Sequence, residues 1–308
     1  MNPIYPWLRV VIAFFLTVSI AQAQSKDFKV GQGSVTGTYT EAFKELSSAC
    51  STESLPLKPA FPDGKGDGAA NLEALVNSQA QAAFVRNDVI FWQGQGGQLG
   101  HIKTLFTLWP EAVHLVARTQ TVVTVPGKYY GTNQQTVTLN NIYDLIGRRV
   151  AAPGANQITA NVIKAQGGIN FEIVPTADAK EALEKLDSGQ VAAVIFTAGK
   201  PLPVLAKLNT DYKLLAIPQD AAKKLAMVYS PTSLTYSNLS QAFNVPSVEA
   251  QSIFVTKVFN TPAKIKQLTE LRACFFRRLA ELHDEGSPRW QNVNAKDMGK
   301  WPWYELKK

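Results

Sequence analysis

A glycine-rich stretch near the N-terminus, Lys29 to Phe43, carries residue types that can bind an anion. Its sequence, KVGQGSVTGTYTEAF, places hydroxyl side chains and three glycines directly before a run with helical spacing. The glycines at 31, 33 and 37 are one residue too widely spaced for a dinucleotide fingerprint, and no Lys-Ser or Lys-Thr pair follows as a P-loop requires. A helix N-terminus attracts anions through its unpaired backbone N–H groups and its dipole. An anion-binding loop and an ordinary glycine-rich turn both remain open.

The first 23 residues predict export from the cytoplasm. Arg9 is the only charge before the apolar run VVIAFFLTVSIA, and Ala21-Gln22-Ala23 is a cleavage signal of the A-x-A type. The apolar run is shorter than the roughly 20 residues that a membrane-spanning helix needs. We therefore expect a cleaved signal peptide, a soluble periplasmic protein and a mature N-terminus at Gln24. A retained membrane anchor is the alternative.

The net charge and the length of the chain indicate its kind of partner and its number of lobes. The formal net charge of +7 falls to +6 without Arg9, and Lys and Arg are scattered along the chain. We expect no nucleic-acid partner because no basic, aromatic-interleaved motif is present. The positive charge favours small anionic ligands in general. A mature chain of about 285 residues exceeds the usual size of one core and predicts two lobes.

The only cysteines are Cys50 and Cys274. An even pair in an oxidising compartment favours one disulfide, and two buried free thiols are the alternative. His101, His114 and His283 have no metal-ligand spacing, so we expect neither a metal site nor a cofactor.

Two segments resemble each other and organise the chain. Leu72 to Asn87 and Leu183 to Thr197 each read as a helix, a turn and a strand, and a glycine-bearing strand-to-helix junction precedes each copy. Alternating strands and helices predict parallel or mixed sheets with helices on both faces. Ligands bind outside the carboxyl ends of the strands in such sheets.

Four loops at those strand ends are therefore candidate walls of a ligand cleft. They are Gly33 to Tyr39, Arg86 to Asp88, Pro153 to Gln157, and Thr197 to Gly199. The candidate ligand-binding residues are Gly33, Ser34, Thr36, Gly37, Thr38, Tyr39, Arg86, Asn87, Asp88, Pro153, Gly154, Ala155, Asn156, Gln157, Thr197, Ala198 and Gly199.

Two strand-like segments, Glu111 to Arg118 and Ser247 to Lys257, bracket the second half and predict two hinge crossings. Lobe one would then comprise residues 24–118 and 247–308, and lobe two residues 119–246. We expect no single continuous sheet across both halves. The amphipathic segment Lys264 to Leu282 would close lobe one, which places Cys50 and Cys274 in the same lobe and makes a bridge between them reasonable.

The order of these motifs resembles the TRAP-associated extracytoplasmic immunogenic (TAXI) solute-binding proteins, a branch of the type II periplasmic binding-protein fold. Five stretches carry the resemblance: KVGQGSVTGTYTEAF, NLEALVNSQAQAAFVRNDV, WPEAVHLVAR, NIYDLIGRRVAAPGANQITANVI and FTAGKPLPVL. The resemblance implies an α/β protein with two hinge crossings and a ligand cleft between its lobes. It also implies a monomer that captures a small, carboxylate-bearing solute, such as an amino acid or dicarboxylate, and delivers it to a TRAP-type membrane permease.

Three departures from the family pattern concern the ligand. Arg86-Asn87-Asp88 stands where the family has Gln-Ser-Asp, and Gly154 to Ile158 replaces Gly-Ser-Gly-Thr-Glu. An insertion from Thr121 to Thr138 lengthens the path into lobe two.

The enzyme class lacks support, because neither a G-x-S-x-G elbow nor an H-E-x-x-H motif is present. We expect no catalytic residues. The segment Asp63 to Gly68 reads as a flexible loop, since the calcium-loop pattern and its distal Glu are missing. A ligand-sensing receptor for a membrane signalling protein remains the first alternative to transport, and a periplasmic enzyme the second.

For the ligand itself, we expect the hydroxyls of Ser34, Thr36 and Thr38 to bind an anionic end while Tyr39 packs on its body. Arg86 is the candidate counter-charge because its fork can meet a carboxylate with two parallel hydrogen bonds. The alternative is that Arg86 forms a structural ion pair with Asp88 or another acidic residue.

Overall fold

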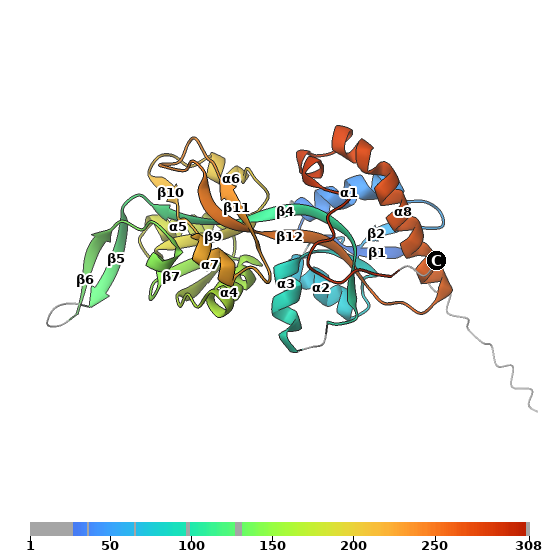
Figure 1. Ribbon diagram of the computed structural model, residues 1–308, viewed down its shortest axis with the longest axis horizontal. Coiled ribbons are helices and arrows are strands. Elements are labelled where there is room, and N and C mark those ends of the chain that lie inside the picture. Colours follow the sequence, from blue (N-terminus) through green and yellow to red (C-terminus); the bar gives the residue numbers. More distant parts are fainter. Residues whose placement is uncertain (1–26, 36, 65, 97–98, 127–130, 306–308) are drawn as a thin grey trace, which may run out of the picture.

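The computed structural model describes residues 27–35, 37–64, 66–96, 99–126 and 131–305. The predicted signal peptide and Thr36 lie outside this range. Figure 1 shows two bodies side by side, joined by the long strands β4 (Ile102–Arg118) and β12 (Val245–Lys257). Each strand begins in one body and ends in the other, so the predicted two-lobed α/β fold with two crossings is confirmed.

Lobe one contains both ends of the described chain. Its strands follow the order β2-β1-β3-β12-β4, with β1 parallel to both β2 and β3 and with β12 antiparallel to β3 and β4. Its other elements are β1 (Phe28–Gly31), α1 (Thr38–Cys50), β2 (Leu57–Pro59), α2 (Gly68–Val76), β3 (Ala82–Arg86), α3 (Asn87–Gln93), η1 (Gly94–Gly96), α8 (Pro262–Glu285) and η3 (Pro288–Asn292).

Lobe two continues the sheet in the order β4-β9-β7-β8, while β10 pairs with β4 and β11 pairs with β12. Its elements are η2 (Ile142–Leu145), β7 (Arg149–Pro153), α4 (Asn156–Gly167), β8 (Glu172–Thr176), α5 (Ala179–Asp187), β9 (Ala193–Ala198), α6 (Pro203–Ala206), β10 (Tyr212–Leu214), α7 (Gln219–Lys224) and β11 (Ser230–Leu234).

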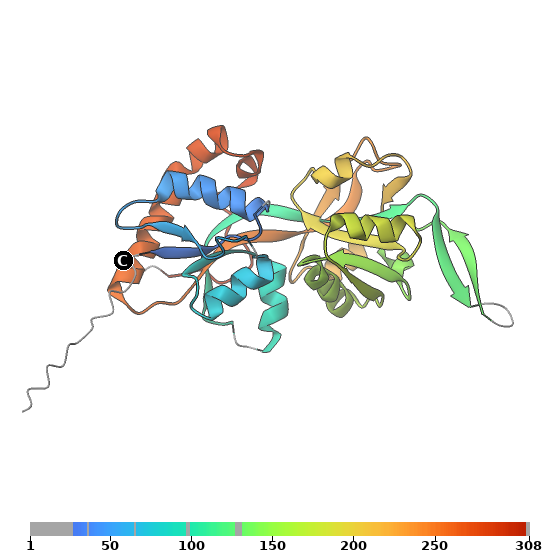
Figure 2. The same ribbon diagram turned by 180° about the vertical axis from the view of Figure 1, so that it is seen from behind.

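The predicted insertion at Thr121 to Thr138 forms a separate ribbon. Strands β5 (Thr121–Pro126) and β6 (Thr132–Val137) pair antiparallel with each other in a two-stranded sheet. In both ribbon views they project from the end of lobe two that is farthest from lobe one (Figures 1 and 2).

The expectation that no single sheet spans both halves is wrong. β4 and β12 pair with each other on both sides of the crossing, from Glu249↔Ala112 to Lys257↔Ile102, and hydrogen bonds therefore connect ten strands. A register shift lies between Gln251 and Ile253, next to Pro110, which has no N–H to donate to the ladder. β12 changes partners here as well, from β11 at 245–249 to β3 at 252–256. The strands thus change lobes without ending.

Separate apolar cores stabilise the two lobes. In lobe one, Phe106 stacks between Phe254 and Phe275, with ring centroids 4.6 and 3.7 Å away. α8 contributes a stripe of buried residues at helical spacing, including Leu268, Leu271, Phe275, Leu279 and Leu282. In lobe two, β7 and β9 supply buried Val150, Ala152, Ala193 and Ile195 to a core shared with α4 and α7.

A disulfide joins Cys50, the last residue of α1, to Cys274 on α8, with Sγ atoms 1.97 Å apart. Both cysteines are buried in the core of lobe one. Within the described part of the chain, no helix has the length and apolar character needed to cross a bilayer.

Candidate functional site between the lobes

Helix α3 of lobe one packs against lobe two. β3 ends at Arg86 and α3 begins at Asn87, so the predicted loop Arg86 to Asp88 is the first turn of a short helix. Phe91 and Trp92, farther along α3, pack against the core of lobe two. Conversely, Ile158 of α4 packs against a core cluster of lobe one. Apolar side chains of each lobe therefore pack against the core of the other lobe here.

Arg86 and Asp88 form a buried, two-pronged ion pair. Arg86 Nε lies 2.9 Å from Asp88 Oδ1, and Nη2 lies 3.2 Å from Oδ2. The side chains are 7% and 0% exposed. Burial opposes the charge on Arg86, but Asp88 and then Glu111 outweigh it and hold the pKa of the guanidinium above its ordinary value. This pair matches the alternative prediction, in which Arg86 forms a structural ion pair with an acidic residue.

The same ion pair is hydrogen bonded to lobe two. Arg86 Nη2 donates to the carbonyl of Ala155 (3.2 Å) and to Thr159 Oγ1 (3.0 Å), and Nη1 donates to the carbonyl of Thr197 (3.5 Å). Asp88 Oδ2 accepts from the hydroxyls of Thr159 (2.7 Å) and Tyr229 (3.0 Å). All three guanidinium nitrogens are thus donors to protein acceptors. Burial, and next the charge of Asp88, raise the pKa of Tyr229 well above its ordinary value, which keeps the phenol a donor.

Asn87 makes a second link between the lobes. Its amide nitrogen donates to the carbonyl of Val228 (2.6 Å), and its amide oxygen accepts from the backbone N–H of Gln251 on β12 (3.0 Å). Beside it, a cavity of about 250 Å³ is lined by both lobes and by the C-terminal segment. Lys300 of that segment donates to the carbonyls of Ala226 and Tyr229, each at 2.7 Å, and so connects the end of the chain to lobe two.

The two candidate loops of lobe two are held together by Asn156. Its amide nitrogen donates to the carbonyl of Pro153 (2.8 Å), and its amide oxygen accepts from the N–H of Thr197 (2.8 Å). Gly154 has a φ of 52°, which favours glycine, and α4 begins two residues later. Pro153 to Gln157 and Thr197 to Gly199, at the carboxyl ends of β7 and β9, are therefore neighbours.

A second polar chain links the glycine-rich loop to both crossing strands. The Tyr39 hydroxyl lies 3.0 Å from Ser252 Oγ on β12, and Ser252 donates to Glu111 Oε1 on β4 at 2.7 Å. Glu111 Oε2 lies 3.8 Å from Arg86 Nη1, which connects the two polar clusters. Burial and then the Glu111 charge raise the pKa of Tyr39 well above its ordinary value, so the phenol stays protonated. The ring of Tyr39 stacks on Phe84, 5.7 Å between centroids.

The glycine-rich loop is partly closed by its own hydrogen bonds. Gly33 N–H donates to Asn71 Oδ1 (3.1 Å), and Gly37 N–H donates to the carbonyl of Ser34 (2.9 Å). Gly37 precedes α1 and makes no side-chain cap. Among the described residues, no hydrogen bond is formed by the backbone N–H groups of Thr38 and Tyr39, the first residues of α1. Ser34 and Thr38 are exposed. The loop therefore keeps donors available at a helix N-terminus.

The structure thus brings three of the four predicted loops together around Arg86. No hydrogen bond between described residues joins Gly33 to Tyr39 directly to either loop of lobe two; the connection runs through Ser252 and Glu111. Sequence reasoning missed Thr159 and Tyr229. Thr159 stands one helical turn after Ala155, which would have indicated that both face the same way. No motif or residue pattern around Tyr229 indicated that it belongs to the site.

No protein-family model matches the chain. Solved structures of binding proteins are similar to it in fold. One is the substrate-binding protein AbpA of an amino acid ABC transporter from Streptococcus pneumoniae, bound to L-arginine: 13% identity, TM-score 0.48, covering 87% of this chain and 97% of that one. Another is an ancestral arginine-binding protein bound to arginine: 10% identity, TM-score 0.49, covering 86% and 98%. A third is a TctC solute-binding protein from Polaromonas: 15% identity, TM-score 0.46, covering 86% and 89%.

Proposed function

We propose that this protein is an extracytoplasmic solute-binding protein that captures a small solute between its lobes and delivers it to a membrane transporter. The observation that carries this proposal is the arrangement of two separately cored lobes on two long strands, with polar side chains of both lobes meeting at the crossing. Binding between lobes joined in this way couples ligand contact to lobe movement. The predicted signal peptide supports an extracytoplasmic site of action.

For the ligand, we propose a carboxylate-bearing solute such as an amino acid or dicarboxylate. The free N–H groups at the start of α1 and the exposed hydroxyls of Ser34 and Thr38 are donors suited to a carboxylate. Tyr39 packs beside them and is the side chain for the body of the solute. Pro153 to Gln157 and Thr197 to Gly199 supply the opposite wall.

Arg86 has a different role in this proposal from the residues of the glycine-rich loop. Its three nitrogens already donate to Asp88, Thr159 and carbonyls of lobe two, so a ligand carboxylate must displace one of these acceptors to reach it. Direct recognition of the solute by Arg86 stays a prediction. The contacts themselves support a role in joining the lobes.

For the partner, we propose a TRAP-type permease, on the strength of the TAXI-like motif order. A sensor protein that reads the liganded state would use the same lobe movement. Gene neighbours distinguish them: a permease gene beside this one supports transport, and a histidine kinase gene supports sensing.

A thermal-shift screen of amino acids, dicarboxylates and tricarboxylates tests the ligand class. A solute at about one hundred times its Kd stabilises the folded protein by about 2.7 kcal/mol. At about 2 °C per kcal/mol for a chain of this size, the expected rise in Tm is about 5 °C. A flat response across the whole panel, with folded protein confirmed by circular dichroism, would contradict the proposed ligand class.

A further inference from the structure

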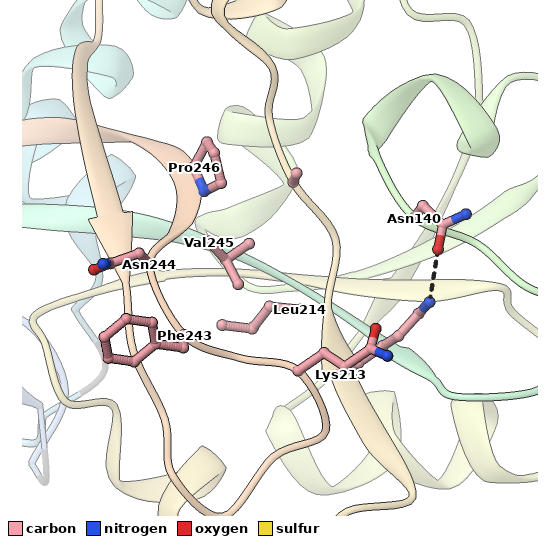
Figure 3. A pocket seen from close by; sticks show the side chains of 9 residues that line it. Asn140, Lys213, Leu214, Phe243, Asn244, Val245 and Pro246 are labelled. Carbon is pink, nitrogen blue, oxygen red and sulfur yellow. Dashed lines mark hydrogen bonds between the residues drawn. The ribbon is translucent and has the colours of Figure 1, made fainter.

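A second cavity lies wholly within lobe two and contains a buried lysine. Its volume is about 320 Å³, and it is lined by Asn140, Lys213, Leu214, Ala216, Gln241, Phe243, Asn244, Val245 and Pro246. None of these residues takes part in the contacts between the lobes described above. In Figure 3, Lys213 and Asn140 lie on one side of the cavity, and Phe243, Asn244 and Pro246 lie on the other.

Lys213 is held in place by the backbone on both sides of its strand. It pairs with Ala117 of β4 in the sheet and forms a bridge to Ser240. Its side chain is almost fully enclosed, because the residue is only 6% exposed. Its ammonium lies at the cavity, beside Asn140.

The ammonium of Lys213 has few partners for a buried charge. Nζ donates to Asn140 Oδ1 at 3.1 Å, and an ammonium carries three N–H donors. Among the described residues, no carboxylate lies within 4 Å of it. Asp144 is the acidic group whose charge acts on it, but Asp144 Oδ2 already accepts from the N–H groups of Asn140 (2.7 Å) and Asn141 (3.0 Å). Burying an ammonium without a paired anion is costly, so an anion in the cavity would stabilise it.

The other residues that line the cavity indicate which chemical groups the rest of a ligand would carry. Phe243 is 76% exposed, an unusual position for a phenyl ring, and Leu214, Val245 and Pro246 add apolar surface. Gln241 and Asn244 add amide groups to the lining. The volume is at the small end of the range for ligand pockets. One anionic group and a short apolar or aromatic body fit this combination.

We propose that this cavity binds a small organic acid, with the carboxylate on Lys213 and Asn140 and the apolar body against Phe243. The carboxylate accepts the two N–H donors of the ammonium that have no described partner, in charge-assisted hydrogen bonds. Desolvation lowers the pKa of Lys213, and a bound carboxylate acts in the opposite direction by favouring the charged form. This site is independent of the solute site proposed between the lobes.

Benzoate is a suitable probe, with inorganic phosphate as a second anion that has no apolar body. In ¹⁵N–¹H spectra at constant ionic strength, benzoate should shift the backbone amides of Lys213, Asn140 and Asn244. Lys213→Met keeps the length of the side chain and removes the charge, and should weaken benzoate binding at least tenfold. Lys207→Met, at an exposed lysine of the same lobe, should leave the affinity unchanged.

Folding of Lys213→Met is expected, since a buried charge is replaced by an apolar group of similar size. Its spectrum without benzoate provides the check. If that variant does not fold, Lys213→Arg, which keeps the charge, and protection of Lys213 by benzoate against amine acetylation, read by peptide mass spectrometry, test the same contact. Three results would overturn the proposal: no shifts at these amides at millimolar benzoate, equal affinity in Lys213→Met, or binding of phosphate but not of benzoate.

Discussion

The glycine-rich loop and the Arg86 cluster are both predicted ligand-binding regions, yet their polar groups differ in whether they have hydrogen-bond partners within the protein. Around Arg86, every guanidinium nitrogen donates to a protein acceptor, and the acceptors belong to both lobes. In the glycine-rich loop, Ser34 and Thr38 are exposed and the first N–H groups of α1 stay without a described partner. The contrast separates a region whose polar groups connect the lobes from one whose donors have no partner among the described residues.

This difference shows why a buried charge that the protein itself neutralises is weak support for ligand binding. A desolvated arginine must be neutralised and hydrogen bonded in the free protein, unless a ligand always occupies the site. Asp88 supplies that neutralisation within two residues of Arg86. A helix N-terminus carries only partial charge, so it can stay hydrated in the free protein at little cost in free energy.

Replacement of Arg86 by Gln is expected to have the largest effect on the fold. It leaves Asp88 buried without its counter-charge, and the loss of one partner of a buried pair lowers the free energy of unfolding by about 3–5 kcal/mol. Urea unfolding of the free protein measures it. The control is Arg149→Gln, whose exposed pair with Glu172 contributes at most about 1 kcal/mol. An unchanged unfolding energy together with a roughly 30-fold weaker solute affinity, equal to about 2 kcal/mol, would reverse the comparison and make Arg86 the counter-charge of the ligand.

Replacement of Gly33 by Ala tests how far the loop depends on its backbone conformation. Gly33 has a φ of 94°, which L side chains rarely adopt, and an added Cβ would lie 3.7 Å from Tyr39 Cβ. The space is sufficient, so backbone strain should dominate and lower the free energy of unfolding by about 1–3 kcal/mol. Gly100→Ala is the matched control, because its Cβ would meet nothing within 4 Å. Equal unfolding energies for the two variants would show that the loop tolerates another conformation.

Replacement of Tyr39 by Phe breaks the connection between the two regions and leaves the ring in place. It removes the hydrogen bond to Ser252, and a lost hydrogen bond of this kind lowers the free energy of unfolding by about 0.5–1.5 kcal/mol. Differential scanning calorimetry of the free protein measures it. A double-mutant cycle with Ser252→Ala should show coupling between the two changes. Additive effects would mean that the two hydroxyls do not interact in solution.

Replacement of Ser34 by Ala should have the smallest effect on the fold. Its exposed hydroxyl makes no described contact that stabilises the free protein, so the change in unfolding energy should stay within about 0.5 kcal/mol. Loss of a hydrogen bond to the solute should nevertheless weaken binding by about 2- to 12-fold. Ser233→Ala, at an exposed serine of lobe two, is the control for isothermal titration calorimetry. Equal affinities in both variants would remove Ser34 from the site.

Sequence periodicity was sufficient to predict much of the architecture. The apolar runs AAFV and AAVIF are the buried strands β3 and β9, and the segment from Lys264 lies in α8 with its apolar stripe on the core. The two crossings followed from two alternating segments that bracket the second half. These features depend on local pattern, which a single sequence carries.

The details of the site depend on long-range pairing and could not be predicted in the same way. β4 and β12 pair through the crossing, which makes the sheet continuous, and strand partners are chosen by tertiary packing. Asp88 receives hydroxyls from Thr159 and Tyr229, 71 and 141 residues away in the chain. The ion pair of Arg86 with Asp88 was foreseen as an alternative because the two residues are close in sequence. Their partners in lobe two were not.

Small-angle X-ray scattering of the protein with and without a solute from the thermal-shift screen tests the central claim most directly. If the solute binds between the lobes and couples them, saturation should change the distribution of distances between the lobes and lower the radius of gyration. The same titration on Ser34→Ala should need more solute to reach the same change. Identical scattering curves with and without solute, at a concentration where calorimetry shows full occupancy, would contradict binding by lobe closure.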